Sequence, residues 1–197
     1  MFKLNYILDR IILKPEELTN KISTEDLLIS KIKTKYVGKV LFKYGIVCSL
    51  KSLKIINNTI VEIEGVINIE YETQLITFSP SNGDILYGNI INSSEEGILV
   101  NCGICKVHIK PHGLFENCEF CSSDSIWSWR LKNDTYYYNI NEEVRLKVQS
   151  VSYINENKTS EQILSLSKLK ENIEISDYMI IYGCFNQSGL GPLRWWN

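Results

Sequence analysis

The sequence lacks the excess of positive charge that proteins with a strong intrinsic affinity for nucleic acid usually carry. Its 21 Lys and Arg residues are outnumbered by 23 Asp and Glu residues, which gives a formal net charge of -2. Neutralisation of phosphates supplies much of the affinity of such proteins. Any contact with nucleic acid is therefore expected to be local, weak or assisted by partners.

Long apolar runs are also absent. No stretch approaches the roughly 18 residues that a membrane-spanning helix needs, and residues 1–4 alternate in polarity instead of opening a secretion signal. We therefore expect neither a membrane partner nor secretion. With 44% apolar and 22% charged residues, the chain has ample material for packed cores.

The sequence offers little for catalysis. It contains two histidines, His108 and His112, and no glycine-rich phosphate loop precedes an expected helix. No Ser or Cys nucleophile has a histidine base that the sequence fixes beside it. The carboxylates are scattered through polar stretches, which is the ordinary pattern of a solvated surface. We predict that the protein is not an enzyme.

The first 80 residues have the pattern of a compact α+β domain. Alternating polarity from Phe2 predicts a strand that ends before Pro15. Pro15 is expected to open a first helical turn, and Ser23 to cap a second helix. The apolar face of that helix is expected to pack on an antiparallel sheet and consists of Leu28, Ile32 and Tyr36. The sheet is predicted from segments rich in β-branched and aromatic residues, interrupted by a polar break at 54–58, and these segments are 40–48, 59–63 and 74–78.

The strongest turn signal in the chain lies at residues 79–83, Ser-Pro-Ser-Asn-Gly, and marks the expected domain boundary. Beyond it, short strands alternate with turns, which is typical of a small closed barrel. The five expected barrel strands are 85–91, 97–101, 106–110, 127–131 and 144–151, and residues 178–184 add one more. We predict two domains, at 1–80 and 81–197, of which the second is all β.

Several short motifs occur along the whole chain in an order and spacing that are known from one family. They are Gly38-Lys39-Val40, Phe78-x-Pro80, Asp84-Ile85-Leu86-x-Gly88, Ile126-Trp127-x-Trp129 and Glu142 to Val148. Together they resemble the larger stalk subunits of archaeal and eukaryotic RNA polymerases. The most specific motif is the tail, Gly189-Leu190-Gly191-x-Leu193-x-Trp195-Trp196, which looks like the RNA polymerase III version.

The resemblance implies an N-terminal α+β domain that docks on the polymerase core and an S1-like OB-fold barrel near the RNA exit path. It also implies a nuclear, non-catalytic subunit that pairs with a smaller helical stalk subunit. Such a subunit supports transcription initiation beside the initiation factors and contacts nascent RNA. The family places its docking tip in the segment that corresponds here to the expected loop Leu53 to Gly65.

Three other interpretations stay open. A free-standing OB-fold RNA-binding or translation-associated protein would bind RNA with micromolar or better affinity as the isolated chain. The equivalent subunit of RNA polymerase II is disfavoured by the tail. A zinc-dependent enzyme would need an open coordination position, which four cysteines around one metal ion do not leave.

Within the S1-like pattern, bases stack on exposed aromatic side chains while basic residues meet the RNA backbone. His108 matches the histidine on the third strand of that pattern. Glu96 and Leu99 stand where the pattern carries stacking aromatics, a loss of roughly 1–3 kcal/mol per base. Arg145 and Lys147 alternate with apolar residues and are expected on the outer face of their strand. There they meet either RNA phosphate or solvent alone.

Four of the six cysteines form two C-x-x-C pairs, Cys102 with Cys105 and Cys118 with Cys121, separated by twelve residues. Two turns that each offer two thiolates are typical of a structural zinc site, with the two histidines as substitute ligands. Against this, the strand at 106–110 would separate the pairs by roughly 17 Å, and the stalk family does not generally carry these cysteines. Reduced free thiols, with no required cofactor, are the alternative.

The aromatic residues of the second half are divided between the core and the surface. About half of Trp127, Trp129 and the tyrosines at 136–138 are expected to fill the barrel. Trp195 and Trp196 would be costly to leave in water, so at least one of them is expected to pack on the barrel or on a neighbouring subunit.

Overall fold

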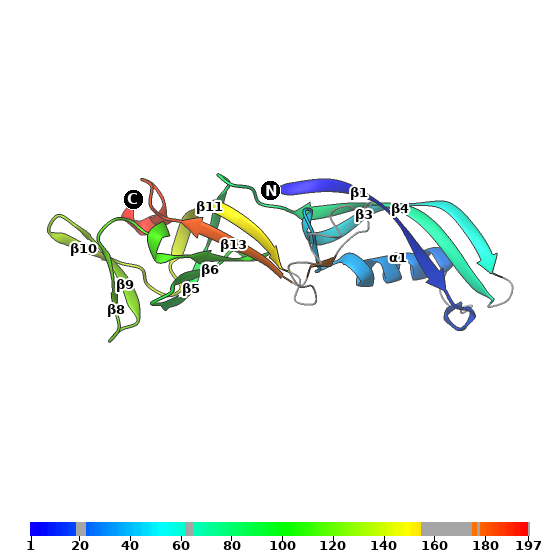
Figure 1. Ribbon diagram of the computed structural model, residues 1–197, viewed down its shortest axis with the longest axis horizontal. Coiled ribbons are helices and arrows are strands. Elements are labelled where there is room, and N and C mark those ends of the chain that lie inside the picture. The colour runs from blue at the N-terminus through cyan, green and yellow to red at the C-terminus, as the bar shows by residue number, and fades with distance from the viewer. Residues whose placement is uncertain (19–22, 62–64, 155–174, 177, 197) are drawn as a thin grey trace, which may run out of the picture. The chain divides into compact units, whose positions relative to one another are not determined.

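The computed structural model describes residues 1–196 except 19–22, 62–64, 155–174 and 177. The chain divides into two compact units (Figure 1), an N-terminal unit of residues 2–79 joined by a short later strand, and a barrel unit of residues 80–154 and 179 onward. The described residues are mostly β, in largely antiparallel sheets with one α-helix. None of the described helices is long and apolar enough to cross a membrane.

The N-terminal unit is an antiparallel sheet with a helix along one face (Figure 1). Its strands are, in sheet order, β1 (Phe2–Leu13), β4 (Val66–Phe78), β3 (Gly45–Val61), β2 (Val40–Leu41) and β12 (Ile175–Ser176). β1 pairs with β4 along its whole length, which confirms the opening strand. Much later in the chain, β12 pairs with β2 and joins this sheet. The domain boundary expected at residue 80 instead assigns the residues of β12 to the second domain.

The polar break expected at 54–58 is wrong. β3 runs through it as one strand of 17 residues, which pairs with β4 with register shifts at three places. Lys54, Asn57 and Asn58 are exposed, so their side chains stay hydrated while their backbone completes the ladder. The segment expected as a loop from Leu53 to Gly65 is therefore strand as far as Val61, and residues 62–64 lie outside the described part of the chain.

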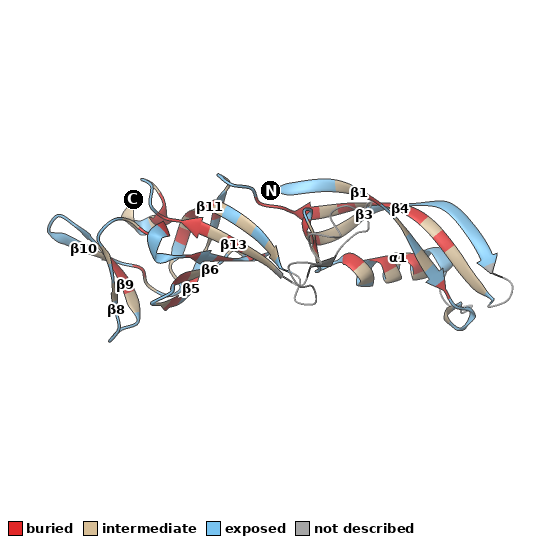
Figure 2. Cartoon of the chain, viewed as in Figure 1, coloured by how far each residue is buried: buried red, intermediate tan, exposed pale blue. Residues whose placement is uncertain are grey.

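The helix α1 (Thr24–Tyr36) begins where the sequence predicts it. The Ser23 Oγ accepts a hydrogen bond from the Asp26 N–H at 3.0 Å, and the Ser23 hydroxyl donates to the Asp26 carboxylate at 2.7 Å. The expected apolar face is confirmed, because Leu28, Ile32 and Tyr36 are buried in the core of the unit. Figure 2 shows buried residues on α1 and along the strands that it faces, whereas much of β1 is exposed.

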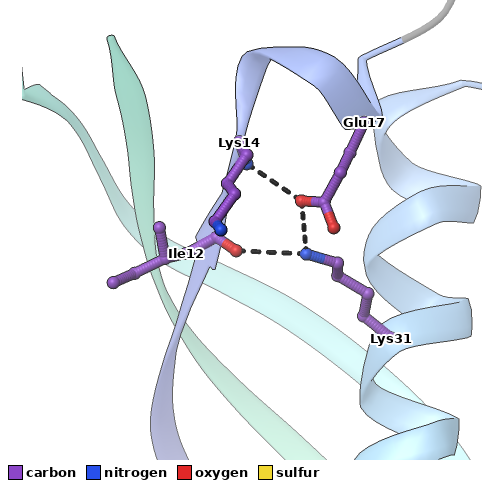
Figure 3. A network of polar contacts seen from close by, with 4 residues as sticks. All are labelled: Ile12, Lys14, Glu17 and Lys31. Carbon is purple, nitrogen blue, oxygen red and sulfur yellow. Dashed lines mark hydrogen bonds and ion pairs between the residues drawn. The ribbon is translucent and has the colours of Figure 1, made fainter. Parts of the chain in front are cut away.

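A group of polar contacts ties α1 to the end of β1 (Figure 3). The ammonium of Lys31 donates to the Ile12 carbonyl at 3.2 Å and to the carboxylate of Glu17 at 2.5 Å. The same Glu17 oxygen accepts from the Lys14 N–H at 2.9 Å. These hydrogen bonds hold the pKa of Glu17 below its usual value. The helical turn expected at Pro15 is the short 3-10 helix η1 (Pro15–Glu17), which this contact secures.

A second polar contact lies deeper between helix and sheet. Asp9 on β1 accepts hydrogen bonds from the Lys35 ammonium at 2.5 Å, from the Tyr71 hydroxyl at 2.8 Å and from the Tyr36 hydroxyl. Burial by itself raises the pKa of Asp9, but these hydrogen bonds outweigh it and leave the pKa lowered. Burial likewise raises the pKa of Tyr36 and of Tyr71. The ionised carboxylate therefore fastens the helix to two strands.

The barrel unit contains a closed ring of five strands. The described pairings give the order β13-β7-β6-β5-β11, and β13 pairs in turn with β11, which closes the ring. β7 and β13 are parallel and the other neighbours with described registers are antiparallel. A small ring of this kind is typical of OB-like barrels. The strands are β5 (Ile85–Ser94), β6 (Gly97–Asn101), β7 (Lys106–Ile109), β11 (Glu143–Ile154) and β13 (Tyr178–Cys184).

The barrel strand expected at 127–131 is wrong. That segment is β9 (Ile126–Leu131), the centre of a separate antiparallel sheet with β8 (Cys118–Cys121) and β10 (Asp134–Tyr137). Its alternating pattern fits either sheet, but β13 supplies the fifth barrel strand. The Trp127 indole donates to the Ser94 carbonyl at 2.7 Å and attaches the small sheet to the end of β5.

The tail packs on its own unit. The Trp195 ring centroid lies 4.7 Å from that of Tyr138 and 5.5 Å from those of Trp129 and Tyr136. The Trp196 indole donates to the Leu190 carbonyl at 2.9 Å. The expectation that at least one terminal tryptophan packs on its own unit is therefore confirmed for Trp195, which packs against the small sheet and Tyr138. The short strand β14 (Gly191–Pro192) and the 3-10 helix η3 (Leu193–Trp195) position both rings, with β14 paired to β11.

Candidate nucleic-acid interface on the barrel

Strand β7 and Lys110, the residue that follows it, present a row of basic side chains on the outside of the barrel. Lys106, His108 and Lys110 are exposed, whereas Val107 and Ile109 between them are buried in the barrel. The alternation follows from the two-residue period of a strand. Among the described residues, neither lysine of this row forms an ion pair. The row therefore leaves two ammonium groups and an imidazole facing solvent.

A tyrosine stands beside this row. Parallel pairing sets Tyr182 of β13 opposite His108 of β7, and their ring centroids are 6.2 Å apart. The ammonium of Lys110 lies 4.6 Å from the centroid of the Tyr182 ring, a cation–π distance. On the other side of β7, antiparallel pairing sets half-buried Leu99 of β6 opposite His108. His108 thus lies between an aromatic ring and an aliphatic side chain.

Residues of β5, β6, β7 and β13 line a shallow depression of about 530 Å³. It is lined by Asn92, Ser94, Glu96, Gly97, Ile98, Leu99, His108, Ile109, Lys110 and Tyr182. Gly97 is required at its edge, because its φ is +131° and a Cβ there would lie 2.0 Å from the Ile109 carbonyl oxygen. This close approach of β6 to β7 brings Glu96, one of the two residues at the expected stacking positions, into the lining.

Arg145 and Lys147 lie elsewhere on the barrel. Both are on β11, and β13 lies between β11 and β7 in the ring. The Arg145 Nε donates to the Gly189 carbonyl at 2.6 Å, and the Lys147 ammonium donates to the Gln187 side chain at 3.3 Å. Both cations are half-buried and hold the turn before β14. The structure does not bring them together with His108.

The first cysteine pair lies at the hairpin between β6 and β7. The Cys102 N–H donates to the Cys105 carbonyl at 2.9 Å, which closes the turn. A hydrogen bond between the two thiols lowers the pKa of Cys102 and raises that of Cys105. Cys102 is half-buried and Cys105 is buried. This pair is therefore a compact dithiol within one turn.

The second cysteine pair has different neighbours. Cys118 lies 3.9 Å from the Tyr138 hydroxyl, and burial raises its pKa to about 11. Cys121 is exposed and contacts the side chains of Ser123 at 3.1 Å and Asp124 at 3.6 Å. Within the described residues, no three His, Cys, Asp or Glu side chains are grouped so as to hold a metal ion. The two pairs are not brought together, so the described arrangement does not fit a four-thiolate zinc site.

Three residues of this face are not among the sequence-based candidates, although the pattern of two of them is visible in the sequence. Lys106 and Lys110 carry a visible signal, because they alternate with buried aliphatic residues as Arg145 and Lys147 do. Tyr182 carries no local signal of its own. Its place beside His108 depends on the parallel pairing of β7 with β13, which joins segments more than 70 residues apart.

Residues 84–196 match the family model described as RNA polymerase III subunit Rpc25. The match covers more than half of the chain and includes the whole of the tail. The chain belongs to this family. The matched residues contain the described part of the barrel, the small sheet of β8 to β10 and the tail that packs on both.

Proteins similar over their full length carry a consistent name. The chain is 28% identical to DNA-directed RNA polymerase III subunit rpc8 of Schizosaccharomyces pombe, with all of both chains covered. It is 24% identical to the Bos taurus subunit RPC8, with all of this chain and 98% of the relative covered. The RPC8 of Saccharomyces cerevisiae is 23% identical, again over all of both chains. The similarity therefore includes the N-terminal unit as well as the barrel.

Proposed function

We propose that the protein is a non-catalytic subunit of DNA-directed RNA polymerase III. The observation that carries the proposal is the family match over the barrel and tail together with full-length similarity to subunits of that polymerase. The sequence also lacks the motifs of nucleotide-binding and hydrolytic enzymes. Activity of the subunit is then expected only within the polymerase, in the nucleus.

Within that assembly we assign the protein to the stalk, where it pairs with a smaller helical subunit and supports initiation. In this assignment the N-terminal domain, residues 1–80, docks on the polymerase core, and the barrel, residues 81–197, is an S1-like OB domain near initiation factors and nascent RNA. Support for a docking tip comes from the C-terminal half of β3, where Ile55, Ile56 and Ile60 are 45%, 50% and 66% exposed. Exposed aliphatic side chains in one segment are typical of a surface that a partner covers.

The alternatives have less support. The equivalent subunit of RNA polymerase II would not account for relatives that are all named for polymerase III. A free-standing OB-fold RNA-binding protein would not account for full-length similarity to polymerase subunits, or for a net charge of -2. A metal cofactor is not required by the proposed role, and free thiols fit the separate surroundings of the two cysteine pairs.

Purification of the tagged protein from its own cells tests the assignment. The expected result is co-purification of the largest subunit of RNA polymerase III and of a smaller helical protein in equal amounts, identified by mass spectrometry. Recovery of the largest subunit of polymerase II, or of translation factors without any polymerase subunit, would contradict it. Ile56→Asp and Ile60→Asp in the C-terminal half of β3 should reduce recovery of the core, whereas Leu131→Asp in the barrel unit, a matched exposed site, should not.

A further inference from the structure

The hairpin between β6 and β7 holds two thiols face to face. Asn101 pairs with Lys106 at the base of this hairpin, and the Cys102 N–H donates to the Cys105 carbonyl at 2.9 Å. Facing residues that share a backbone hydrogen bond have Cα atoms about 5.5 Å apart, and their side chains lie on the same side of the hairpin. A disulfide needs a Cα separation of about 4.4–6.8 Å. The backbone of the turn therefore has the spacing that a disulfide between Cys102 and Cys105 requires.

Contacts within the barrel unit hold this turn and its first thiol in place. Gly103 has a φ of +81°, and its N–H donates to the Asn101 side chain at 3.1 Å. The Cys102 thiol lies against β5, because a Cβ at Gly88 would lie 2.9 Å from its sulfur. A side chain at residue 88 would therefore displace the thiol. The two sulfurs are hydrogen-bonded to each other, so they are already in contact in the reduced protein.

The two thiols differ in access and in acidity. Cys102 is half-buried, whereas Cys105 is 8% exposed. The hydrogen bond between them lowers the pKa of Cys102 and raises that of Cys105. The thiolate is the nucleophile in cysteine chemistry. Cys102 is therefore the sulfur that meets an oxidant first, and Cys105 lies directly beside it.

The second cysteine pair shows that C-x-x-C spacing alone does not produce this arrangement. Cys118 and Cys121 are the first and last residues of one strand, β8. Three residues of extended strand separate their Cα atoms by roughly 10 Å. Cysteines more than about 7 Å apart form no disulfide without movement of the backbone. The fold therefore distinguishes two pairs that the sequence presents as equivalent.

A metal ion fits the first pair less well than a disulfide does. Zinc takes four ligands in structural sites, and no third His, Cys, Asp or Glu among the described residues is grouped with Cys102 and Cys105. A disulfide needs two sulfurs and no further group. We propose that Cys102 and Cys105 are a site of reversible oxidation, at which a hydroperoxide such as hydrogen peroxide converts the two thiols to an intramolecular disulfide. This chemistry belongs to the chain itself and does not depend on its assignment to a polymerase.

The oxidation takes place in two steps. The Cys102 thiolate attacks one oxygen of hydrogen peroxide, the O–O bond breaks, and the released hydroxide takes up a proton from solvent and leaves as water. Cys102 is then a sulfenic acid. The Cys105 sulfur attacks the Cys102 sulfur, the S–O bond breaks, and the hydroxide combines with the Cys105 proton and leaves as a second water. A dithiol reductant returns the two electrons and two protons by thiol–disulfide exchange and becomes a disulfide itself.

Treatment of the full chain with a few equivalents of hydrogen peroxide, followed by alkylation of the remaining thiols in denaturant, tests the proposal. Tryptic peptides are then mapped by mass spectrometry without reduction, and cleavage after Lys106 separates the two cysteine pairs. In the wild type, two of the six thiols should be lost, both from the peptide that ends at Lys106, whose mass should fall by two hydrogens. A small dithiol should restore both thiols. Wild-type chain that keeps both thiols, or that loses those of the second pair to the same extent, would overturn the proposal.

Serine variants separate the roles of the two sulfurs. Cys105→Ser should leave Cys102 as a sulfenic acid, which dimedone labels, whereas Cys102→Ser should leave Cys105 unmodified at the same dose of peroxide. The matched control, Cys118→Ser with Cys121→Ser, should form the disulfide as the wild type does. Equal dimedone labelling of the two single variants would contradict the order of the two steps.

Metal analysis of the purified wild-type chain gives a further test. The expected result is less than one zinc ion per ten chains, with no difference between the wild type and Cys102→Ser. About one zinc ion per chain in the wild type that is lost in Cys102→Ser would overturn the proposal, because the turn would then be part of a metal site.

Discussion

Two strands of the same barrel carry cations on their outer faces, but only the cations of one strand are hydrogen-bonded to another segment of the chain. On β11, Arg145 and Lys147 donate to Gly189 and Gln187 in the turn that precedes β14. On β7 and directly after it, Lys106 and Lys110 form no ion pair within the described chain. Alternation of cations with apolar residues therefore indicates an outer face, but a neighbouring segment of the chain decides whether those cations remain available to a ligand.

The largest effect on stability is expected in the tail, which pairs with β11 through β14. Trp195→Ala removes the ring that contacts Trp129, Tyr136 and Tyr138, and should lower the free energy of unfolding of the barrel by about 3 kcal/mol, the low end for a buried tryptophan because this one is half-buried. All four tryptophans lie in the barrel unit, so their fluorescence in a urea titration reports that unit alone. Trp196→Ala should cost less. A midpoint for Trp195→Ala equal to that of the wild type would show that this ring does not stabilise the barrel unit.

The next largest effect on stability is expected at Asp9 in the N-terminal unit. Asp9→Asn weakens hydrogen bonds from Lys35, Tyr36 and Tyr71 and should destabilise the N-terminal unit by about 1.5–3 kcal/mol. Hydrogen exchange of the α1 amides measures the loss. Glu70→Gln, in an ion pair with exposed Arg10, is the control and should cost less than about 1 kcal/mol.

The same carboxylate makes a prediction about pH. The pKa of Asp9 is lowered in the folded protein, so its contribution is fully present above the unfolded value of about 3.9 and is lost as the pH falls through the folded pKa. Protection of the α1 amides should therefore decline below about pH 4 in the wild type. In Asp9→Asn this component of the decline should vanish, and an unchanged profile would exclude Asp9 as its source.

A smaller effect is expected at Arg145. Replacing it with Gln removes the hydrogen bond to the Gly189 carbonyl and should cost about 1.5 kcal/mol, the low end for a charged donor because the side chain is half-buried. Gly189→Ala should act at the same place, since its φ is +81° and its Cβ would lie 2.6 Å from Arg145. The double variant should cost less than the sum of the two. Strict additivity would show that the two residues act independently.

The smallest effect on stability is expected at two lysines, Lys147 on β11 and Lys110 directly after β7, and their RNA affinities distinguish the two strands. Lys147→Gln should change barrel stability by less than about 0.5 kcal/mol and leave RNA affinity unaltered, because its ammonium donates to Gln187. Lys110→Gln should likewise leave stability unaltered but reduce RNA affinity. Urea titration and RNA anisotropy of both variants measure the two quantities. Equal losses of RNA affinity would remove the distinction between β11 and β7.

Local patterns were sufficient for the elements that depend on neighbouring residues. The alternation of β1, the Ser23 cap and the face of Leu28, Ile32 and Tyr36 are each confirmed. The polar residues of β3 wrongly predict a break, because an exposed stretch of strand tolerates lysine and asparagine. Strand membership of β9 could not be read either, since its pattern fits two different sheets.

The candidate site divides in the same way. His108 and the outward direction of the cations follow from the period of a strand. The engagement of Arg145 with Gly189 and the approach of Tyr182 to His108 depend on contacts between segments far apart in sequence. No local pattern encodes such pairings, so the sequence alone assigned the binding role to β11 as well as to β7.

Photo-crosslinking of a thiouridine-containing single-stranded RNA to the full chain, followed by peptide mapping, tests the central claim most directly. The account predicts that crosslinked peptides come from β7 and from β13 around Tyr182. Crosslinks confined to β11 and the turn at residues 187–189, with none on β7 or β13, would contradict it.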